Sequence, residues 1–286
     1  MTSISEVAEQ QRAYWNGPAS EPWIRHQEER DASLAPIGQL AMAKLPLVPG
    51  ARVLDIGCGC GSTSMALAER VGSDGAVLGV DLSEPMLASG EESRRAAGLS
   101  QLAFRAGDAA TEVFPGGPFD AVFSRFGVMF FADPVAAFRN IHGAMAADGA
   151  LAFVCWRVLA DNPWVLVARD VVLRHVPPQE PTAPDAPGQF AFADPERVRF
   201  VLSEAGFSDI QIEPQDFPFV VSPSLDLDAA VATVMTRGPS VRLLAGADEA
   251  TLEKVRADLG PVLRPHMTDR GLVLGGAVWV VSARNG

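Results

Sequence analysis

The feature that most constrains the fold is the stretch of residues 52–64, RVLDIGCGCGSTS. It begins with an apolar run rich in β-branched residues, which is the composition of a buried parallel strand. Glycines then occupy the alternate positions 57, 59 and 61, and residues 62–70 (STSMALAER) have the apolar spacing of a helix. A strand, a glycine loop and a helix in this order turn the chain sharply and direct a helix N-terminus at any ligand on the loop. The stretch therefore predicts a ligand-binding loop.

An acidic residue lies twenty positions after the last of these glycines, at the end of a second apolar run, residues 76–80 (AVLGV). This residue, Asp81, is placed to accept hydrogen bonds from both ribose hydroxyls of a nucleoside, as at the second strand of a βαβ unit. A dinucleotide site uses the spacing G-x-G-x-x-G around a pyrophosphate. Here Asp55 stands two residues before the first glycine and gives D-x-G-x-G-x-G instead. Its carboxylate would repel a pyrophosphate but suits an ammonium group, which argues against a nicotinamide oxidoreductase.

This pattern resembles the cofactor-binding motif of class I S-adenosylmethionine-dependent methyltransferases, whose cofactor carries a ribose, an amino acid and a sulfonium but no phosphate. The likeness covers residues 51–156 and is to the small-molecule branch, similar to enzymes of quinone and secondary-metabolite biosynthesis. It implies a doubly wound α/β fold with a seven-stranded, mostly parallel sheet, the Rossmann-like methyltransferase fold. It also implies S-adenosyl-L-methionine as the cofactor and S-adenosyl-L-homocysteine as its product.

The resemblance gives each matching residue an expected role. The acid and the glycines of the loop would bind the methionine end of the cofactor, Asp81 the ribose, and Leu82 the flank of the adenine. Asp108 and Ala109, after a short third strand, would hydrogen-bond the adenine edge, and Ser124 would offer its backbone near the methionine ammonium. The expected cofactor residues are Asp55, Gly57, Gly59, Gly61, Asp81, Leu82, Asp108, Ala109 and Ser124.

Around this core the chain divides into further segments. We expect an N-terminal helical cap (1–50), the cofactor-binding core (51–160), a gate loop with helices and the sixth strand (161–223), a helical cap insertion (224–270) and the last strand of the core sheet (271–286).

Prolines mark two places within these segments. The helical pattern of residues 22–44 is expected to be interrupted near Pro36. Residues 177–188 (PPQEPTAPDAPG) hold five prolines, too many for a regular element, and predict a surface loop that could act as a gate. The insertion at 224–270 stands where the resembled fold normally has a short turn. Insertions of this kind usually determine substrate choice.

Large aromatic side chains cluster in the N-terminal segment and at the strand ends, where they would border an acceptor pocket. The N-terminal rings could instead simply pack on the sheet edge. Arg125 could bind an acidic substrate, or it could pair with a nearby carboxylate. The expected substrate-pocket residues are Trp15, Trp23, Arg125, Phe126, Met129, Trp156 and Trp164.

Methyl transfer from a sulfonium is an in-line displacement, for which the protein mainly supplies proximity and alignment. Well-oriented reactants reach effective molarities of about 10⁵ to 10⁸ M. A general base is needed only if the acceptor must lose a proton early. His26 and Tyr14 are the candidate bases, with His175 and His266 as further options, but a lone histidine is more often structural. No catalytic residue is therefore assigned from the sequence.

Composition and charge argue against several classes of function and location. The formal net charge of −12 argues against a nucleic-acid partner. No apolar run reaches the roughly 18 to 20 residues of a membrane span, and the polar N-terminus lacks the apolar core of a secretion signal. The three cysteines, Cys58, Cys60 and Cys155, show no disulfide or metal-ligand spacing and suggest free thiols in a reducing cytoplasm. We expect no metal.

The expected function is methyl transfer to a small, largely apolar acceptor that is aromatic or polyketide-like. The alternative is a cofactor-binding protein of the same fold that is regulatory or catalyses a non-methyl reaction. The sequence leaves open whether the acceptor atom is oxygen, nitrogen or carbon. It also leaves open the oligomeric state, for which a homodimer is one option.

Overall fold

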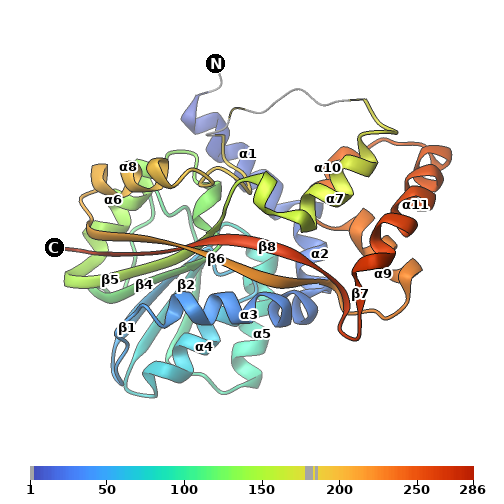
Figure 1. Ribbon diagram of the computed structural model, residues 1–286. Coiled ribbons are helices and arrows are strands. Elements are labelled where there is room, and N and C mark those ends of the chain that lie inside the picture. Colours follow the sequence, from blue (N-terminus) through green and yellow to red (C-terminus); the bar gives the residue numbers. More distant parts are fainter. Residues whose placement is uncertain (1–2, 178–182, 184–185) are drawn as a thin grey trace.

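The computed structural model describes residues 3–177, 183 and 186–286. Within these residues one eight-stranded sheet forms the centre of the molecule (Figure 1). The strands are β1 (Arg52–Ile56), β2 (Ala76–Asp81), β3 (Leu102–Ala106), β4 (Phe119–Arg125), β5 (Met145–Trp156), β6 (Ser208–Ser222), β7 (Met267–Thr268) and β8 (Gly271–Arg284).

The strand order is β3-β2-β1-β4-β5-β8-β6, and the short β7 pairs with β8. The strands from β3 to β5 are parallel, whereas β8 runs antiparallel to both β5 and β6. This confirms the expected doubly wound, mostly parallel sheet, whose seven predicted strands are β1 to β6 and β8. The two-residue β7 is an addition to it.

Helices cover both faces of the sheet and extend beyond one end of it. In Figure 1, α3, α4 and α5 lie on one face and α6 and α8 on the other, while α7, α9, α10 and α11 gather at the end of the sheet away from the C-terminus. The helices are α1 (Ile4–Asn16), α2 (Glu21–Arg25), α3 (Gln27–Met42), α4 (Ser62–Val71), α5 (Glu84–Ala96), α6 (Pro134–Ala144), α7 (Pro163–Val172), α8 (Pro195–Glu204), α9 (Leu227–Thr236), α10 (Pro239–Leu243) and α11 (Glu249–Leu263).

The predicted interruption near Pro36 is wrong. Pro36 lies inside α3, and the chain instead breaks at His26, between α2 and α3, where φ is −112° and ψ is 27°. Proline removes one intrahelical hydrogen bond. The helix nevertheless continues, because it buries apolar side chains on both sides of the proline, among them Leu34 and Ile37 at 6% and 1% exposure. Tertiary packing thus overrides the local effect of the proline.

The edge position of β6 agrees with its composition. Pro214 and Pro218 lie within this strand and pair with Trp279 and Gly275 of β8. Proline cannot donate a hydrogen bond to a sheet, so prolines are tolerated in a strand that has a neighbour on one side only.

The parallel strands end together at one edge of the sheet. Ile56 at the end of β1 pairs with Val80, and Asp81 pairs with Ala106 at the end of β3. The chain leaves β1 and β4, which are neighbours, toward helices on opposite faces. This is the switch point at which open α/β sheets bind their ligands.

Most of the predicted gate loop, residues 178–182 and 184–185, lies outside the described residues. Among the helices that are described, none combines the length and the hydropathy that crossing a lipid bilayer would require.

Candidate functional site

A cavity of about 290 Å³ opens at the carboxyl ends of the parallel strands. This volume is just below the range of about 300–1,000 Å³ that is typical of small-molecule sites. Six of the nine expected cofactor residues line it: Gly57, Gly59, Asp81, Leu82, Asp108 and Ala109. The cavity is therefore built on the loops that follow β1, β2 and β3.

The glycine loop turns through left-handed backbone conformations that favour glycine. The φ angles of Gly57, Gly59 and Gly61 are 67°, 56° and 82°. A Cβ on Gly61 would lie 2.3 Å from the ring of Phe104, so this position is closed by packing. At Gly59, by contrast, the nearest atom to such a Cβ is Met86 Sδ at 3.9 Å. The loop thus presents open backbone at its centre, which a ligand can approach closely.

Asp81 joins the glycine loop to the turn after β2. Its Oδ2 accepts a hydrogen bond from the backbone N–H of Gly59, and its Oδ1 accepts one from that of Ser83, both at 2.8 Å. Burial raises the pKa of this carboxyl group, although both backbone hydrogen bonds oppose the shift. Each oxygen keeps a second lone pair. The group can therefore accept further hydrogen bonds from a pair of hydroxyls in the cavity.

Asp55 lies behind the loop and does not line the cavity. The residue is fully buried, and its Oδ2 accepts hydrogen bonds from Thr63 Oγ1 at 2.7 Å and Ser64 Oγ at 2.6 Å. Its Oδ1 has no hydrogen-bond partner in the described part of the chain. Burial raises the pKa of Asp55 to about 6. The carboxyl group therefore fixes the start of α4 and retains one unsatisfied acceptor.

The loop after β3 is held by a residue from α6. Asn140 Nδ2 donates to the backbone oxygens of Ala109 and Glu112, both at 2.9 Å. Asp108 Oδ1 accepts from the N–H of Ala110 at 2.9 Å. These contacts fix the backbone of the segment that was expected to hydrogen-bond an adenine edge. Asn140 itself was not expected from the sequence.

The end of α1 docks on the turn after β2. Asn16 Nδ2 donates to the backbone oxygen of Leu82 at 2.8 Å, and Asn16 Oδ1 accepts from the N–H of Glu84 at 3.0 Å. Ser83 Oγ donates to the backbone oxygen of Trp15 at 2.7 Å. The N-terminal segment is therefore a wall of the cavity, attached to the turn that carries Asp81.

Aromatic side chains form the far wall of the cavity. Phe126 stacks on Trp156 with a ring separation of 4.5 Å and an angle of 13°, and Trp156 contacts Trp164 at 4.9 Å. The backbone of Phe126 has φ = 64°, an uncommon conformation for a bulky residue. Such local strain persists only where the surroundings enforce it, and it is often found at binding sites.

All seven expected substrate-pocket residues line this cavity. Near α1, the ring of Trp15 lies 5.7 Å from that of Trp23 and 5.2 Å from that of Phe130. Of the two roles considered for Arg125, the structure shows pairing with a nearby carboxylate. Its Nη2 contacts Asp31 Oδ1 at 2.5 Å and Ser62 Oγ at 3.0 Å.

The candidate bases do not line the cavity. Tyr14 is exposed on α1, and His26 lies between α2 and α3 with its pKa lowered by burial and then by Arg237. His175 Nε2 lies 2.9 Å from Asp258 Oδ2, and His266 belongs to a 3₁₀ turn after α11. None of these residues is placed to take a proton from a group inside the cavity.

Gly61 and Ser124 also do not line the cavity. Gly61 is the N-cap residue of α4, and Ser124 is fully buried, with its Oγ accepting from the N–H of Gly127 at 3.3 Å. Asn162, which follows the fifth strand, is fully buried and holds backbone groups in place. Its Oδ1 accepts from the N–H of Ala277 at 2.9 Å, and its Nδ2 donates to nearby backbone oxygens.

One wall of the cavity was not expected from the sequence. Gln27, Arg30, Asp31 and Leu34 of α3 line it at the spacing i, i+3, i+4 and i+7. This spacing places them on one helix face, so the pattern was available. The spacing shows that these residues share a face, but it does not show what that face contacts, so this wall was not predicted. The cavity is also lined by Phe219, Val220, Val221, Arg237 and Gly238.

No cluster of His, Cys, Asp and Glu able to hold a metal ion occurs among the residues that the structure describes.

Comparison with known proteins agrees with this geometry. Residues 53–149 match a family model described as a methyltransferase domain. The chain is 36% identical to nocamycin O-methyltransferase of Saccharothrix syringae, over 36% of this chain and 37% of that protein. It is 29% identical to demethylmenaquinone methyltransferase of Geobacillus kaustophilus, over 62% of this chain and 79% of that protein.

The fold is also that of the [4+2]-cyclase SpnF. The TM-score is 0.53 at 20% identity, covering 87% of this chain and 80% of the cyclase. At this identity the likeness concerns the fold alone. The matched segment from 53 to 149 holds the glycine loop, Asp81 and Asp108. Residues 53–149 therefore match a methyltransferase domain, which bears out the resemblance to class I S-adenosylmethionine-dependent methyltransferases.

Proposed function

We propose that the protein transfers a methyl group from S-adenosylmethionine to a small, largely apolar acceptor, aromatic or polyketide-like. One observation carries this proposal: a single cavity joins the glycine loop and Asp81 on one side to a wall of stacked rings on the other. Sequence similarity to proteins named nocamycin O-methyltransferase and demethylmenaquinone methyltransferase supports a small-molecule acceptor.

The residues around the glycine loop fit this cofactor. Asp81 has free lone pairs for the ribose hydroxyls, and the backbone at Gly59 is open to close approach. The unsatisfied, buried Oδ1 of Asp55 gives the loop a negative background, which suits an ammonium group and disfavours a pyrophosphate. Asp108 and Ala109 would hydrogen-bond the adenine edge. When bound, the cofactor supplies a methyl group that is already activated on a sulfonium.

Beyond binding the cofactor, the protein would promote the reaction by positioning the acceptor. Phe126, Trp156 and Trp164 would hold a flat, apolar acceptor and exclude water from it. Asp31, an acid on this wall, is engaged by Arg125 rather than free to remove a proton. We therefore propose catalysis by proximity and alignment, without a dedicated general base among the residues considered.

Calorimetric titration with S-adenosylmethionine, S-adenosylhomocysteine and NADH tests the cofactor assignment. We expect micromolar binding of the two sulfur compounds and no binding of NADH. Binding of NADH alone would overturn the proposal. The reaction itself is tested by incubating the protein with a panel of phenolic and polyketide-like acceptors and measuring S-adenosylhomocysteine formed. Tight cofactor binding without product from any acceptor would favour the regulatory or non-methyl alternative.

We infer further that the protein acts in the cytoplasm on a small molecule and not on nucleic acid. The net charge of −12 disfavours an extended phosphate-binding surface. Cys58, Cys60 and Cys155 are buried free thiols, which suit a reducing compartment.

A further inference from the structure

The acceptor side of the cavity is more cationic than the whole protein suggests. Among the described residues, Arg30, Arg125 and Arg237 line the cavity, whereas Asp31 is the one carboxylate that lines it on this side. The protein as a whole carries a net charge of −12. A local excess of positive charge in an otherwise acidic protein favours a ligand that carries a negative charge.

Two of the three arginines contact groups of the cavity wall itself. Arg125 is held by Asp31 and a serine hydroxyl, as described above. Arg30 donates to the backbone oxygens of Pro22 and Trp23 at 2.8 and 2.9 Å, and its guanidinium lies 3.8 Å from the centre of the Trp23 ring. Both residues therefore support the wall of the cavity.

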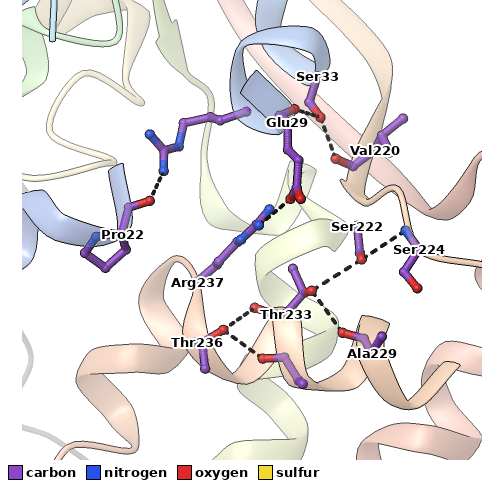
Figure 2. Close-up of polar contacts among 12 residues, drawn as sticks. Pro22, Glu29, Ser33, Val220, Ser222, Ser224, Ala229, Thr233, Thr236 and Arg237 are labelled. Carbon is purple, nitrogen blue, oxygen red and sulfur yellow. Dashed lines mark hydrogen bonds and ion pairs between the residues drawn. The ribbon is translucent and has the colours of Figure 1, made fainter. Parts of the chain in front are cut away.

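Arg237 is bound differently. Its Nη2 contacts Glu29 Oε2 at 2.5 Å (Figure 2), and Glu29 itself does not line the cavity. The Glu29 side chain is 43% exposed, whereas that of Arg237 is 22% exposed. An ion pair with one strongly solvated partner contributes little net stability. Another carboxylate, entering from the cavity side, can therefore replace or share this partner at small cost.

The surroundings of Arg237 suit an anion on an apolar ring. The next residue, Gly238, packs against Trp164: a Cβ on it would lie 3.3 Å from Trp164 Cζ3. Trp164 belongs to the ring wall described above. The pKa of His26 is lowered by burial and next by Arg237, which is consistent with a positive local potential. A guanidinium fork beside stacked rings matches a flat aromatic molecule that carries a carboxylate.

The wall that carries Arg237 does not depend on this ion pair for its attachment. Ser33 Oγ on α3 donates to the backbone oxygen of Val220 at 2.9 Å, and the hydroxyls of Ser222 and Thr233 lie 3.3 Å apart. Figure 2 shows these contacts beside the Glu29–Arg237 pair. Exchange of the partner of Arg237 can therefore occur while β6, α9 and α3 stay in place.

We propose that Arg237 binds a carboxylate group of the acceptor, with Glu29 as the partner that this carboxylate displaces. Arg237 would thus be a specificity-determining residue that selects apolar acceptors with an acidic group over neutral ones. The assignment rests on the proposed function, since it takes the ring-lined half of the cavity to be the acceptor site.

The test uses 2-naphthoate and its neutral isostere 2-naphthamide as probes, titrated into the full chain saturated with S-adenosylhomocysteine. The variants are Arg237→Gln and Glu29→Gln. The matched control is Arg256→Gln, which breaks a similar ion pair with Glu253 within α11, away from the cavity. Thermal unfolding of each variant establishes that it is folded.

We expect the native protein to bind naphthoate about tenfold or more tighter than naphthamide, the size of a charge-assisted hydrogen bond. R237Q should abolish this preference, whereas E29Q should tighten naphthoate binding several-fold because the competing carboxylate is gone. R256Q should change neither. Equal affinity for the two probes in the native protein would overturn the proposal. The proposal would also be overturned if R237Q and E29Q each lost affinity for naphthoate and naphthamide to the same extent. That result is expected if the ion pair only holds the cavity wall in place.

The two proposals can fail separately. S-adenosylhomocysteine binding is measured first, and the naphthoate titration is repeated without it. Absence of cofactor binding contradicts the proposed function, whereas a lost preference for naphthoate in a protein that binds cofactor contradicts only the role of Arg237.

Discussion

Gly57 and Gly127 are in direct backbone contact. A Cβ built on Gly57 would lie 2.6 Å from the Cα of Gly127, and one built on Gly127 would lie 2.7 Å from the Cα of Gly57. The first residue begins the loop after β1 and the second follows the end of β4. No side chain therefore fits between the ends of β1 and β4, the two central strands. Because the two backbones approach this closely, the glycine loop after β1 and the loop after β4, which carries Phe126, border the same cavity.

This contact predicts that Gly127→Ala is destabilising although its backbone is helical, with φ = −79° and ψ = −40°. The added methyl group would also lie 2.8 Å from the backbone oxygen of Ile56. Overpacking of this kind costs about 1–3 kcal/mol in the free energy of unfolding. Denaturant unfolding measures this change. We also expect weaker binding of S-adenosylhomocysteine, because the glycine loop must shift.

Gly143→Ala is the matched control for that variant. Gly143 lies in α6 with no atom within 4 Å of a built Cβ, so the change should stabilise the protein by about 0.5–1 kcal/mol. Equal effects of the two substitutions would contradict the view that the Gly57–Gly127 contact is tight.

The sequence predicts the parts of the site that local geometry determines. The glycine loop and the acid at the end of β2 are recognisable because tight turns and strand ends allow few residue types. The position of Gly127 is not recognisable in this way, since its requirement for glycine comes from a strand distant in the sequence. For the same reason, the contact of Arg237 with Glu29 connects residues 208 positions apart and leaves no local pattern.

The N-terminal segment illustrates a different limit. The rings of Trp15 and Trp23 were expected at the cavity, and they line it. The polar face of α3 was missed, because helical spacing shows which residues share a face but not what that face contacts. The continuation of α3 through Pro36 likewise depends on burial, which a sequence pattern indicates only indirectly.

Removing the Asp81 carboxylate should weaken cofactor binding without unfolding the protein. We expect Asp81→Ala to raise the Kd for S-adenosylhomocysteine about tenfold or more, since a hydrogen bond to a charged group contributes about 1.5–3 kcal/mol. Asp81→Asn keeps one oxygen acceptor and should have a smaller effect. Asp120→Ala is the control, because Asp120 accepts from the N–H of Arg52 at 2.8 Å at the opposite end of the sheet. Calorimetry measures all three; an unchanged Kd in Asp81→Ala would remove Asp81 from the site.

Asp55 should make the stability of the ligand-free protein depend on pH. Its pKa is raised from 3.8 to about 6, so the native state binds the proton more tightly than the unfolded state does. The contribution of Asp55 to the free energy of unfolding is therefore most favourable below about pH 4 and falls as the pH rises to about 6. The fall amounts to about 3 kcal/mol, at 1.36 kcal/mol per unit of pKa difference.

Urea unfolding of the native protein and of Asp55→Asn, from pH 4 to pH 8, measures this effect. Asparagine does not titrate, so the difference between the two curves isolates Asp55 from other groups such as Asp81. The stability of the native protein relative to the variant should decline between pH 4 and pH 6 and then stay constant. A difference that does not change over this range would mean that the carboxyl group has an ordinary pKa.

The attachment of α1 should control access to the cofactor site. No residue of α1 is fully buried, so this helix depends on few anchors, and Asn16 supplies two of them through Leu82 and Glu84. Removing hydrogen bonds that contribute about 0.5–1.5 kcal/mol each should raise the Kd for S-adenosylhomocysteine about three- to tenfold in Asn16→Ala. Hydrogen exchange in α1 should accelerate in the same variant, because the helix end is released from the turn after β2.

Asn285→Ala is the matched control, since its amide donates to the backbone oxygen of Ala146 at 2.9 Å, far from the cavity. If Asn16→Ala leaves both the exchange of α1 and the affinity at native values, the helix is held by its ring contacts at Trp15 and is no part of the cofactor site.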